Sequence, residues 1–283
     1  MAILKCPVGL RGLFSLKTLV FLLSCFVCVE FTLLSTQIST PKIQTSSKVL
    51  LAEKLSRVSV TVIAGNHTGT GIILTRHTKD GKKLHLVLTA AHVVEECRIT
   101  VTRAKIPQIE FKTAMVRVED RYDGRVVRCA DYPAEIIQYS NAETGRDLAV
   151  LKILDPNFPD ANTEFYADGI PAPGTDIYHY GSMFGLSGSF TSGVVSQVGR
   201  NLEGQLFDQV NIAAYPGSSG GGIFVEDGRC VGLVLLLRAP AVVFIVPARE
   251  IEIWSLKAGC RWLTNPSVKV DTDKLSKWPV END

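Results

Sequence analysis

The sequence has no excess of charge of either sign. Its 283 residues include 30 Lys and Arg against 28 Asp and Glu, which gives a formal net charge of +2. No dense basic patch interrupts this balance, and both observations exclude the usual kind of nucleic-acid binder. The chain is long enough for one or two domains with a hydrophobic core, since 46% of its residues are hydrophobic.

Metal-ligand spacing is also lacking in the chain after residue 34. The cysteines there are Cys97, Cys129, Cys230 and Cys260, and no two of them form a Cys-x-x-Cys pair. The histidines show no paired spacing either, so the sequence predicts no metal site and no other cofactor. An even number of cysteines is compatible with two disulfides, in three pairings, or with free buried thiols, and both interpretations stay open.

The first residues combine basic charge with an apolar run. Residues 1–17 carry Lys and Arg but no acid, and residues 18–34 are almost wholly apolar apart from Glu30. This order predicts a secretory signal peptide or a membrane anchor over 1–34, with the rest of the chain outside the cytoplasm. No small-x-small cleavage site follows, and the lipobox-like residues ending at Cys25 are followed by apolar rather than polar residues. A secreted and a membrane-anchored protein both stay open.

The chain after the leader changes from a polar stretch to short β-rich runs. Residues 35–47 are rich in Ser, Thr, Gln and Pro, and a flexible tether is predicted over 35–52. Many short strands separated by Gly, Asn and Asp turns then predict an all-β sandwich or barrel. The expected strands are 57–64, 69–75, 84–89, 99–103, 114–118, 134–139, 148–154, 176–181, 193–198, 207–213, 222–225, 231–237 and 242–246.

Helix-length periodicity is lacking before Pro247. Residues 248–256 are expected to form a closing helix with that proline at its start. The predicted domain therefore covers 53–256. The tail, residues 257–283, is too short for a second domain of ordinary size.

A serine set among glycines stands out in residues 215–224 (YPGSSGGGIF). Glycines adopt backbone angles that other residues resist, and they let a substrate carbonyl approach the main chain. We therefore expect Ser219 to be an exposed nucleophile on a tight turn. The N–H groups of Gly217 and Ser219 are expected to converge on one oxygen, as an oxyanion hole requires. A glycine-rich hairpin turn without a catalytic role is the other interpretation.

The order of the candidate residues along the chain narrows the choice among the known classes of serine hydrolase. Residues 217–221 fit the G-x-S-x-G nucleophile elbow, but no histidine follows Ser219, as the α/β-hydrolase order requires. The subtilisin order needs an aspartate before the histidine, and the only one before His92 is Asp80, in a polar turn. The remaining order is His, Asp, Ser, which chymotrypsin-like double barrels use.

His92 and Asp147 are the candidates for that order. His92 ends the run 86–92 (LVLTAAH), in which two small residues leave room for an imidazole to face a cleft. Asp147 opens the apolar run 147–153, where a buried carboxylate is costly unless it is hydrogen-bonded. A core histidine and an aspartate that caps the turn at Gly145 are the alternatives. Rival aspartates lie in polar turns: Asp120, Asp123 and Asp131. No role is expected for the other histidines: His67, His77, His85 and His179.

Together these motifs resemble the trypsin-like serine peptidases, and among them the HtrA (Deg) protease domain. The matching segments are 68–73 (TGTGII), 89–94 (TAAHVV), 147–153 (DLAVLKI), 192–196 (SGVVS) and 216–221 (PGSSGG). The resemblance runs from about residue 54 to 256. It implies two packed six-stranded antiparallel β-barrels with a C-terminal helix, and a catalytic triad of His92, Asp147 and Ser219.

The resemblance also implies a mechanism and a substrate. Ser219 would attack a peptide carbonyl while His92 takes its proton, Asp147 orients the imidazole, and the N–H groups of Gly217 and Ser219 bind the oxyanion. The substrate would be a polypeptide. The primary specificity pocket would be lined by Ala213, Leu235, Leu236 and Leu237. An apolar lining without an acid predicts a small or medium apolar P1 residue rather than a basic one.

The sequence departs from the family in two places. Leu235, Leu236 and Leu237 stand where the family usually has smaller or more polar residues. In one interpretation they narrow or close the primary specificity pocket. The HtrA resemblance implies a following PDZ domain, for which we expect no room.

A serine endopeptidase is the leading hypothesis for the function, because the candidate triad is complete. A catalytically silent or latent binding protein on the same fold is the alternative, and an esterase is the third.

Overall fold

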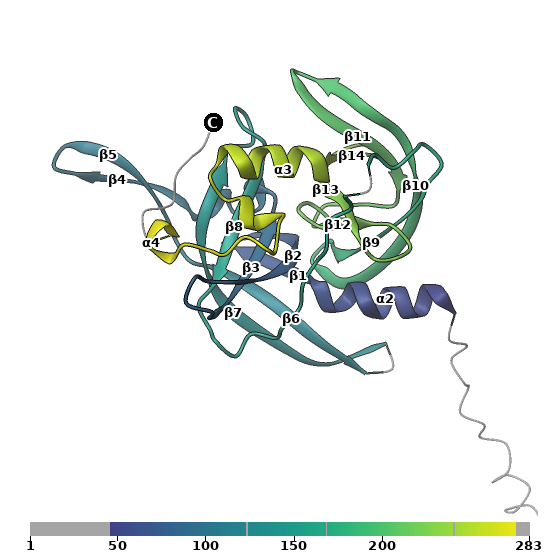
Figure 1. Cartoon of the computed structure of the whole chain (residues 1–283), viewed down its shortest axis with the longest axis horizontal. Coiled ribbons are helices and arrows are strands. Elements are labelled where there is room, and N and C mark those ends of the chain that lie inside the picture. Colours follow the sequence, from purple (N-terminus) through teal and green to yellow (C-terminus); the bar gives the residue numbers. More distant parts are fainter. Residues whose placement is uncertain (1–45, 123, 168, 240, 276–283) are drawn as a thin grey trace, which may run out of the picture. The chain divides into compact units, whose positions relative to one another are not determined.

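The strands form two closed barrels in the computed structural model, which describes residues 46–122, 124–167, 169–239 and 241–275. All neighbouring strands within each barrel pair antiparallel. The first barrel has the order β1 (Ser59–Ala64), β2 (His67–His77), β3 (Lys83–Thr89), β8 (Leu148–Ile153), β7 (Arg125–Ser140) and β6 (Ala114–Tyr122). The second has the order β10 (Leu186–Leu202), β11 (Gln205–Ile212), β14 (Val242–Pro247), β13 (Cys230–Ala239), β12 (Gly222–Phe224) and β9 (Asp176–Met183). Figure 1 shows both, and the predicted all-β fold of two six-stranded barrels is confirmed.

Two apolar runs that the sequence marked as strands form the interior of the first barrel. Residues 86–89 of β3 are buried on both faces, and so is most of β8 beside it. β3 ends at Thr89, which is paired with Gly71 of β2 and Ala149 of β8. The chain leaves the barrel after Thr89, where β3 is hydrogen-bonded to a strand on each side. This pairing restricts the backbone position of the residues that follow.

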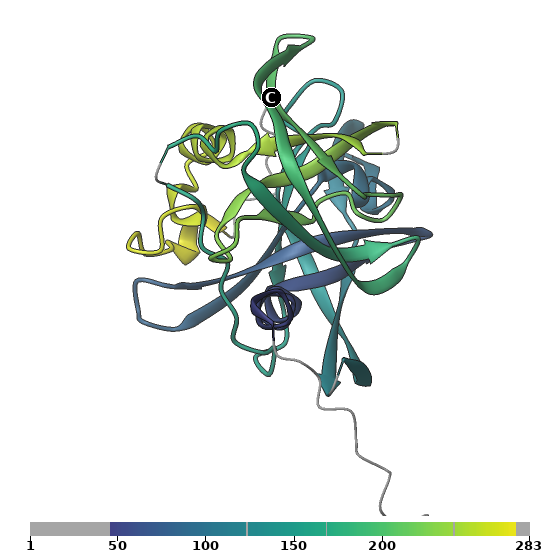
Figure 2. The ribbon, with the colours of Figure 1, turned by 90° about the vertical axis from the view of Figure 1, so that its right-hand side faces the viewer.

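Two longer helices flank the barrels in the described part of the chain, which also contains the four-residue helix α4 (Thr272–Leu275). The closing helix is confirmed as α3 (Ala248–Lys257), with Pro247 at its N-terminal boundary. The other, α2 (Ser47–Val58), was not predicted: Leu51, Leu55 and Val58 form a buried face that contacts β1, β2 and β9. Figure 2 shows α2 end-on beside these strands. Residues 47–52, expected in a tether, therefore belong to this helix.

A separate two-stranded sheet, β4 (Arg98–Arg103) and β5 (Ile106–Phe111), extends away from the first barrel (Figure 1). The sequence predicted β4 and missed β5, whose run contains Pro107. Proline has no N–H to donate to a neighbouring strand, so within sheets it is found in edge strands. In this sheet β5 is such a strand, paired with β4.

The N-terminal segment predicted over 1–34 lies outside the described residues. Among the helices that the structure describes, none has the length and apolar character that a membrane span requires.

Candidate active site

His92 lies in a short 3-10 helix, η1 (Ala91–Val93), directly after the end of β3. Ala90 and Ala91 are fully buried, so the two small residues let the chain turn against the barrel. The His92 side chain is 39% exposed and therefore faces outward from this support. It is accessible, whereas His179 on β9 is fully buried.

Asp147 is bound to the His92 segment through three hydrogen bonds. Its Oδ1 accepts from His92 N at 2.8 Å, and its Oδ2 lies 2.6 Å from His92 Nδ1. Its backbone carbonyl accepts from Ala91 N at 3.2 Å. A carboxylate accepts hydrogen bonds, so this geometry favours the tautomer that carries its hydrogen on Nδ1. Nε2 of His92 is then left as a proton acceptor.

The rival aspartates do not approach His92. Asp131 forms an ion pair with Arg117, at 2.7 Å from Nε to Oδ1, and Asp120 is exposed. Asp123 lies outside the described residues. Among the described aspartates, only Asp147 meets the imidazole.

Ser219 lies in the tight turn between β11 and β12 that the sequence predicted. Ser218 N donates to Tyr215 O at 2.8 Å, and Gly221 N donates to Ser218 O at 3.0 Å. Gly217 has φ +96°, in the region that favours glycine. A Cβ on Gly217 would lie 2.2 Å from Ser182 O, so any other residue there would displace the backbone.

The turn that holds Ser219 lies against the end of β3 that precedes His92. Thr70 N donates to Ser219 O at 2.9 Å, and Thr89 Oγ1 donates to Thr70 O at 2.7 Å. A Cβ on Gly220 would lie 2.2 Å from Thr89 Oγ1, so the approach is as close as a glycine permits. The structure thus brings Ser219 of the second barrel to the segment that carries His92 of the first. No hydrogen bond joins the Ser219 hydroxyl to His92 within the described residues.

Two backbone N–H groups around Ser219 make no hydrogen bond to a described acceptor, those of Gly217 and of Ser219 itself. Pro216 O accepts from Phe184 N at 2.6 Å. The peptide bond between Pro216 and Gly217 is trans, so the Gly217 N–H points to the opposite side from the Pro216 carbonyl. This arrangement keeps the Gly217 N–H available for a ligand oxygen.

The four residues predicted for the specificity pocket lie on both sides of the turn that holds Ser219. Leu235, Leu236 and Leu237 follow Val234 on β13, whose carbonyl accepts from Gly220 N at 2.8 Å. Leu235 is buried at 5% exposure, whereas Leu237 is 42% exposed. Ala213 precedes the turn and is exposed, with its carbonyl accepting from Thr191 Oγ1 at 3.0 Å.

Sequence reasoning missed the supporting roles of Thr70, Thr89 and Phe184. Thr70 Oγ1 donates to Gly217 O at 2.7 Å and accepts from Ser182 N at 2.9 Å. The motif 68–73 was a signal for this position, although it did not indicate what the threonine contacts. Phe184 had no signal, because its contact depends on a turn between β9 and β10.

The four cysteines that the structure describes are free thiols, so a disulfide among them is not supported. Cys97, Cys230 and Cys260 are buried, and Cys129 is exposed. Burial raises the pKa of Cys230 and that of Cys260 to about 12, which keeps these thiols protonated and unreactive. Within the described ranges, no group of three or more His, Cys, Asp or Glu side chains is arranged to hold a metal ion.

Comparison with known proteins gives one family match. Residues 69–233 match the family model described as a trypsin-like peptidase domain. The chain is 35% identical over 114 residues to a probable periplasmic serine endoprotease, DegP-like, of Halomonas elongata. That match covers 39% of this chain and 22% of the relative's length.

Among the solved structures that share the fold are two proteases. The serine endoprotease from Yersinia pestis has a TM-score of 0.56 and 19% identity, covering 78% of this chain and 68% of that one. The Rv3671c protease of Mycobacterium tuberculosis, in an inactive form, has a TM-score of 0.55 and 19% identity. That match covers 74% of this chain and 92% of the other.

Proposed function

The chain belongs to the trypsin-like peptidase family, and from this premise we propose that it is a serine endopeptidase. The observation that carries the proposal is the pair of hydrogen bonds from His92 to the Asp147 carboxylate, beside the turn that holds Ser219. The proposed triad is His92, Asp147 and Ser219, and the proposed oxyanion donors are the N–H groups of Gly217 and Ser219.

The reaction follows from these positions. Ser219 Oγ bonds to the peptide carbonyl carbon and gives its proton to His92 Nε2. The carbonyl oxygen gains negative charge and is stabilised by the two N–H groups. The C–N bond then breaks as His92 passes the proton to the leaving amine. Water, deprotonated by His92, attacks the acyl-enzyme and releases the new carboxylate and the Ser219 hydroxyl.

The apolar residues beside the turn support a substrate preference. We propose that Ala213, Leu235, Leu236 and Leu237 contact the P1 side chain. None of them carries a charge, so an Arg or Lys side chain would be buried there without a partner, at high cost. A small or medium apolar P1 residue fits this lining.

An extracytoplasmic location is also proposed. The basic and apolar leader supports it, as does the word periplasmic in the name of the Halomonas relative. Either a secreted or a membrane-anchored form is compatible with both observations. The substrate is then a polypeptide outside the cytoplasm.

A latent form on the same fold is the second candidate. The observation that favours it is that the Ser219 hydroxyl and His92 share no hydrogen bond in the described part of the chain. In apo enzymes such bonds are often long and tighten only when substrate binds. The two candidates therefore differ in whether the nucleophile is activated in the resting protein.

Fluorophosphonate labelling of the full chain beside a Ser219→Ala variant separates these candidates. We expect labelling of the wild type and none of the variant, because the reagent needs an activated serine and an oxyanion hole. Hydrolysis of casein by the wild type is expected as well. A folded wild type that takes up no label would favour the latent form. Turnover of esters alone would favour an esterase.

A further inference from the structure

The turn between β9 and β10 holds the peptide that carries the Gly217 N–H. Phe184, in this turn, donates its N–H to Pro216 O at 2.6 Å, and its ring lies 5.1 Å from that of Tyr215 between centroids. Phe184 has φ +55°, a conformation that a bulky residue adopts only where its surroundings enforce it. The direction of the Gly217 N–H therefore depends on where this turn is held.

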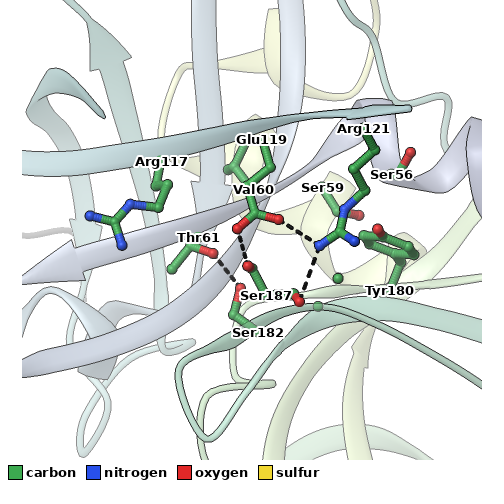
Figure 3. Close-up of a pocket in the computed structure, with 12 residues that line it drawn as sticks. Ser56, Ser59, Val60, Thr61, Arg117, Glu119, Arg121, Tyr180, Ser182 and Ser187 are labelled. Carbon is green, nitrogen blue, oxygen red and sulfur yellow. Dashed lines mark hydrogen bonds and ion pairs between the residues drawn. The ribbon is translucent and has the colours of Figure 1, made fainter. Parts of the chain in front are cut away.

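A group of three side chains connects the turn to the first barrel (Figure 3). Glu119, on β6, accepts from Ser187 Oγ at one carboxylate oxygen and from Arg121 Nη2, at 2.6 Å, at the other. The same Arg121 nitrogen donates to Ser187 O at 3.2 Å. Glu119, Arg121 and Ser187 are together called the Glu119 clamp. It closes a ring of contacts between β6 and the start of β10.

The clamp is largely shielded from solvent. The Glu119 and Arg121 side chains are 13% and 20% exposed. Gly188 follows the clamp with φ +80°, and a Cβ there would lie 1.8 Å from Arg121 Nη2, so the glycine leaves room for the guanidinium. Breaking an ion pair in such a place leaves one charge without a partner, which is unfavourable. The contact therefore resists separation of the turn from β6.

The space beside the clamp is too small for a ligand of its own. The cavity there measures about 20 Å³, whereas small-molecule sites enclose roughly 300 Å³ or more. The polar groups of the clamp bind one another instead. Their arrangement is that of a support for the turn.

We propose that the Glu119 clamp is a positioning device for the reaction at Ser219, which holds the β9–β10 turn so that the Gly217 N–H faces the oxyanion. The chain of contacts runs from Glu119 and Arg121 through Ser187 and Phe184 to the Pro216 carbonyl. This role rests on the proposed endopeptidase function. Loss of the clamp frees the turn and removes one oxyanion donor, while His92 and Asp147 keep their hydrogen bonds.

Kinetics of full-chain variants test the clamp on an apolar P1 peptide nitroanilide. Arg121→Ala is expected to lower kcat by about 10- to 100-fold with KM within about threefold, because an oxyanion donor acts mainly in the transition state. Arg121→Lys keeps the charge and is expected to recover part of the loss. Fluorophosphonate labelling should slow by a factor similar to that for kcat.

Arg117→Ala is the matched control. Arg117 lies on the same strand and lines the same cavity, but its guanidinium pairs with Asp131 and makes no bond to the turn. Its kcat should equal that of the wild type. Ser187→Ala is the milder second variant, which removes a single hydroxyl. It is expected to lower kcat about threefold or more, with an unfolding midpoint near that of the wild type.

The outcomes separate this inference from the function on which it rests. If the wild type is active and the Arg121→Ala and Ser187→Ala variants match Arg117→Ala in kcat, the positioning role of the clamp is overturned and the endopeptidase function stands. A loss confined to KM, or to the unfolding midpoint, would overturn it too. A wild type that neither takes up label nor cleaves peptide would overturn the endopeptidase, and the clamp with it.

Discussion

Asp147 illustrates how one side chain can be fixed by its neighbours. Its φ of +54° is uncommon for a residue other than glycine, and such a conformation persists where the surroundings over-determine it. The hydrogen bonds to His92 N, His92 Nδ1 and Ala91 N do so here. The strain and the bonds occur at the same residue, which is the pattern expected at a functional site.

Asp147→Asn tests the role of this carboxylate. An amide placed there donates toward Nδ1 and favours the tautomer with its hydrogen on Nε2, which cannot accept the Ser219 proton. We expect kcat for peptide hydrolysis to fall by about 10⁴ while the protein stays folded. Asp131→Asn, at the exposed pair with Arg117, is the control and should leave kcat unchanged. Activity within tenfold of the wild type would remove Asp147 from the proposed triad.

At the scale of elements, the segment after α3 is attached to the first barrel. Arg76 of β2 is 1% exposed and donates to Trp262 O at 2.6 Å, to Leu263 O and to Asn162 Oδ1. Desolvation lowers the pKa of Arg76 to about 10, so the guanidinium still carries its charge at neutral pH. Residues 257–275, expected only as a tail, therefore contribute backbone acceptors that this buried charge requires.

Arg76→Met measures the stability that this attachment provides. Methionine fills much of the volume but leaves the Trp262 and Leu263 carbonyls without their donor. We expect the free energy of unfolding to fall by about 2 kcal/mol or more, measured by urea denaturation. Lys79→Ala is the control, because Lys79 joins the same segment through an exposed ion pair to Asp271 and should change little. Equal effects of the two substitutions would contradict the role of burial.

At the scale of the whole molecule, one buried histidine makes stability depend on pH. His179 is fully buried on β9, with Nδ1 3.0 Å from Gly222 O and with no described partner at Nε2. Cβ atoms built on Gly181 and Gly221 would lie within 3 Å of its ring, so the imidazole is packed against the turn that holds Ser219. Burial lowers the pKa of His179, since the charged form would lose its hydration.

The lowered pKa of His179 in the folded protein determines the sign of the pH effect on stability. The unfolded chain takes up a proton on this histidine near pH 6.5, before the folded protein does, so stability is lost as the pH falls below about 6.5. We expect a decrease of up to about 1.4 kcal/mol per pH unit from this group, and none from it above pH 7. His179→Leu should flatten urea-denaturation stability between pH 7 and 5. An unchanged slope in that variant would show that other groups, such as His85, whose pKa burial also lowers, dominate.

Much of the fold could be predicted because its signals are local. Alternating and continuous apolar runs mark strands such as 84–89 and 148–154, and Pro247 marks the start of α3. Helix α2 was missed because its buried face consists of few residues, Leu51, Leu55 and Val58, within a polar stretch. β5 was missed because its proline weakens the strand pattern.

The sequence by itself determined the order His92, Asp147, Ser219, the glycine-rich turn around the serine and the two-barrel fold that the resemblance implied. The triad and the oxyanion donors stay predictions, since their chemistry awaits the experiments above. Only the tertiary structure decided which groups support the turn: Thr70, Thr89, Phe184 and the Glu119 clamp. These contacts join residues far apart in the chain. Those of Thr70 with Gly217 and of the Glu119 clamp form only when one barrel packs against the other. No local pattern of side chains records such an approach, which is why the sequence did not reveal it.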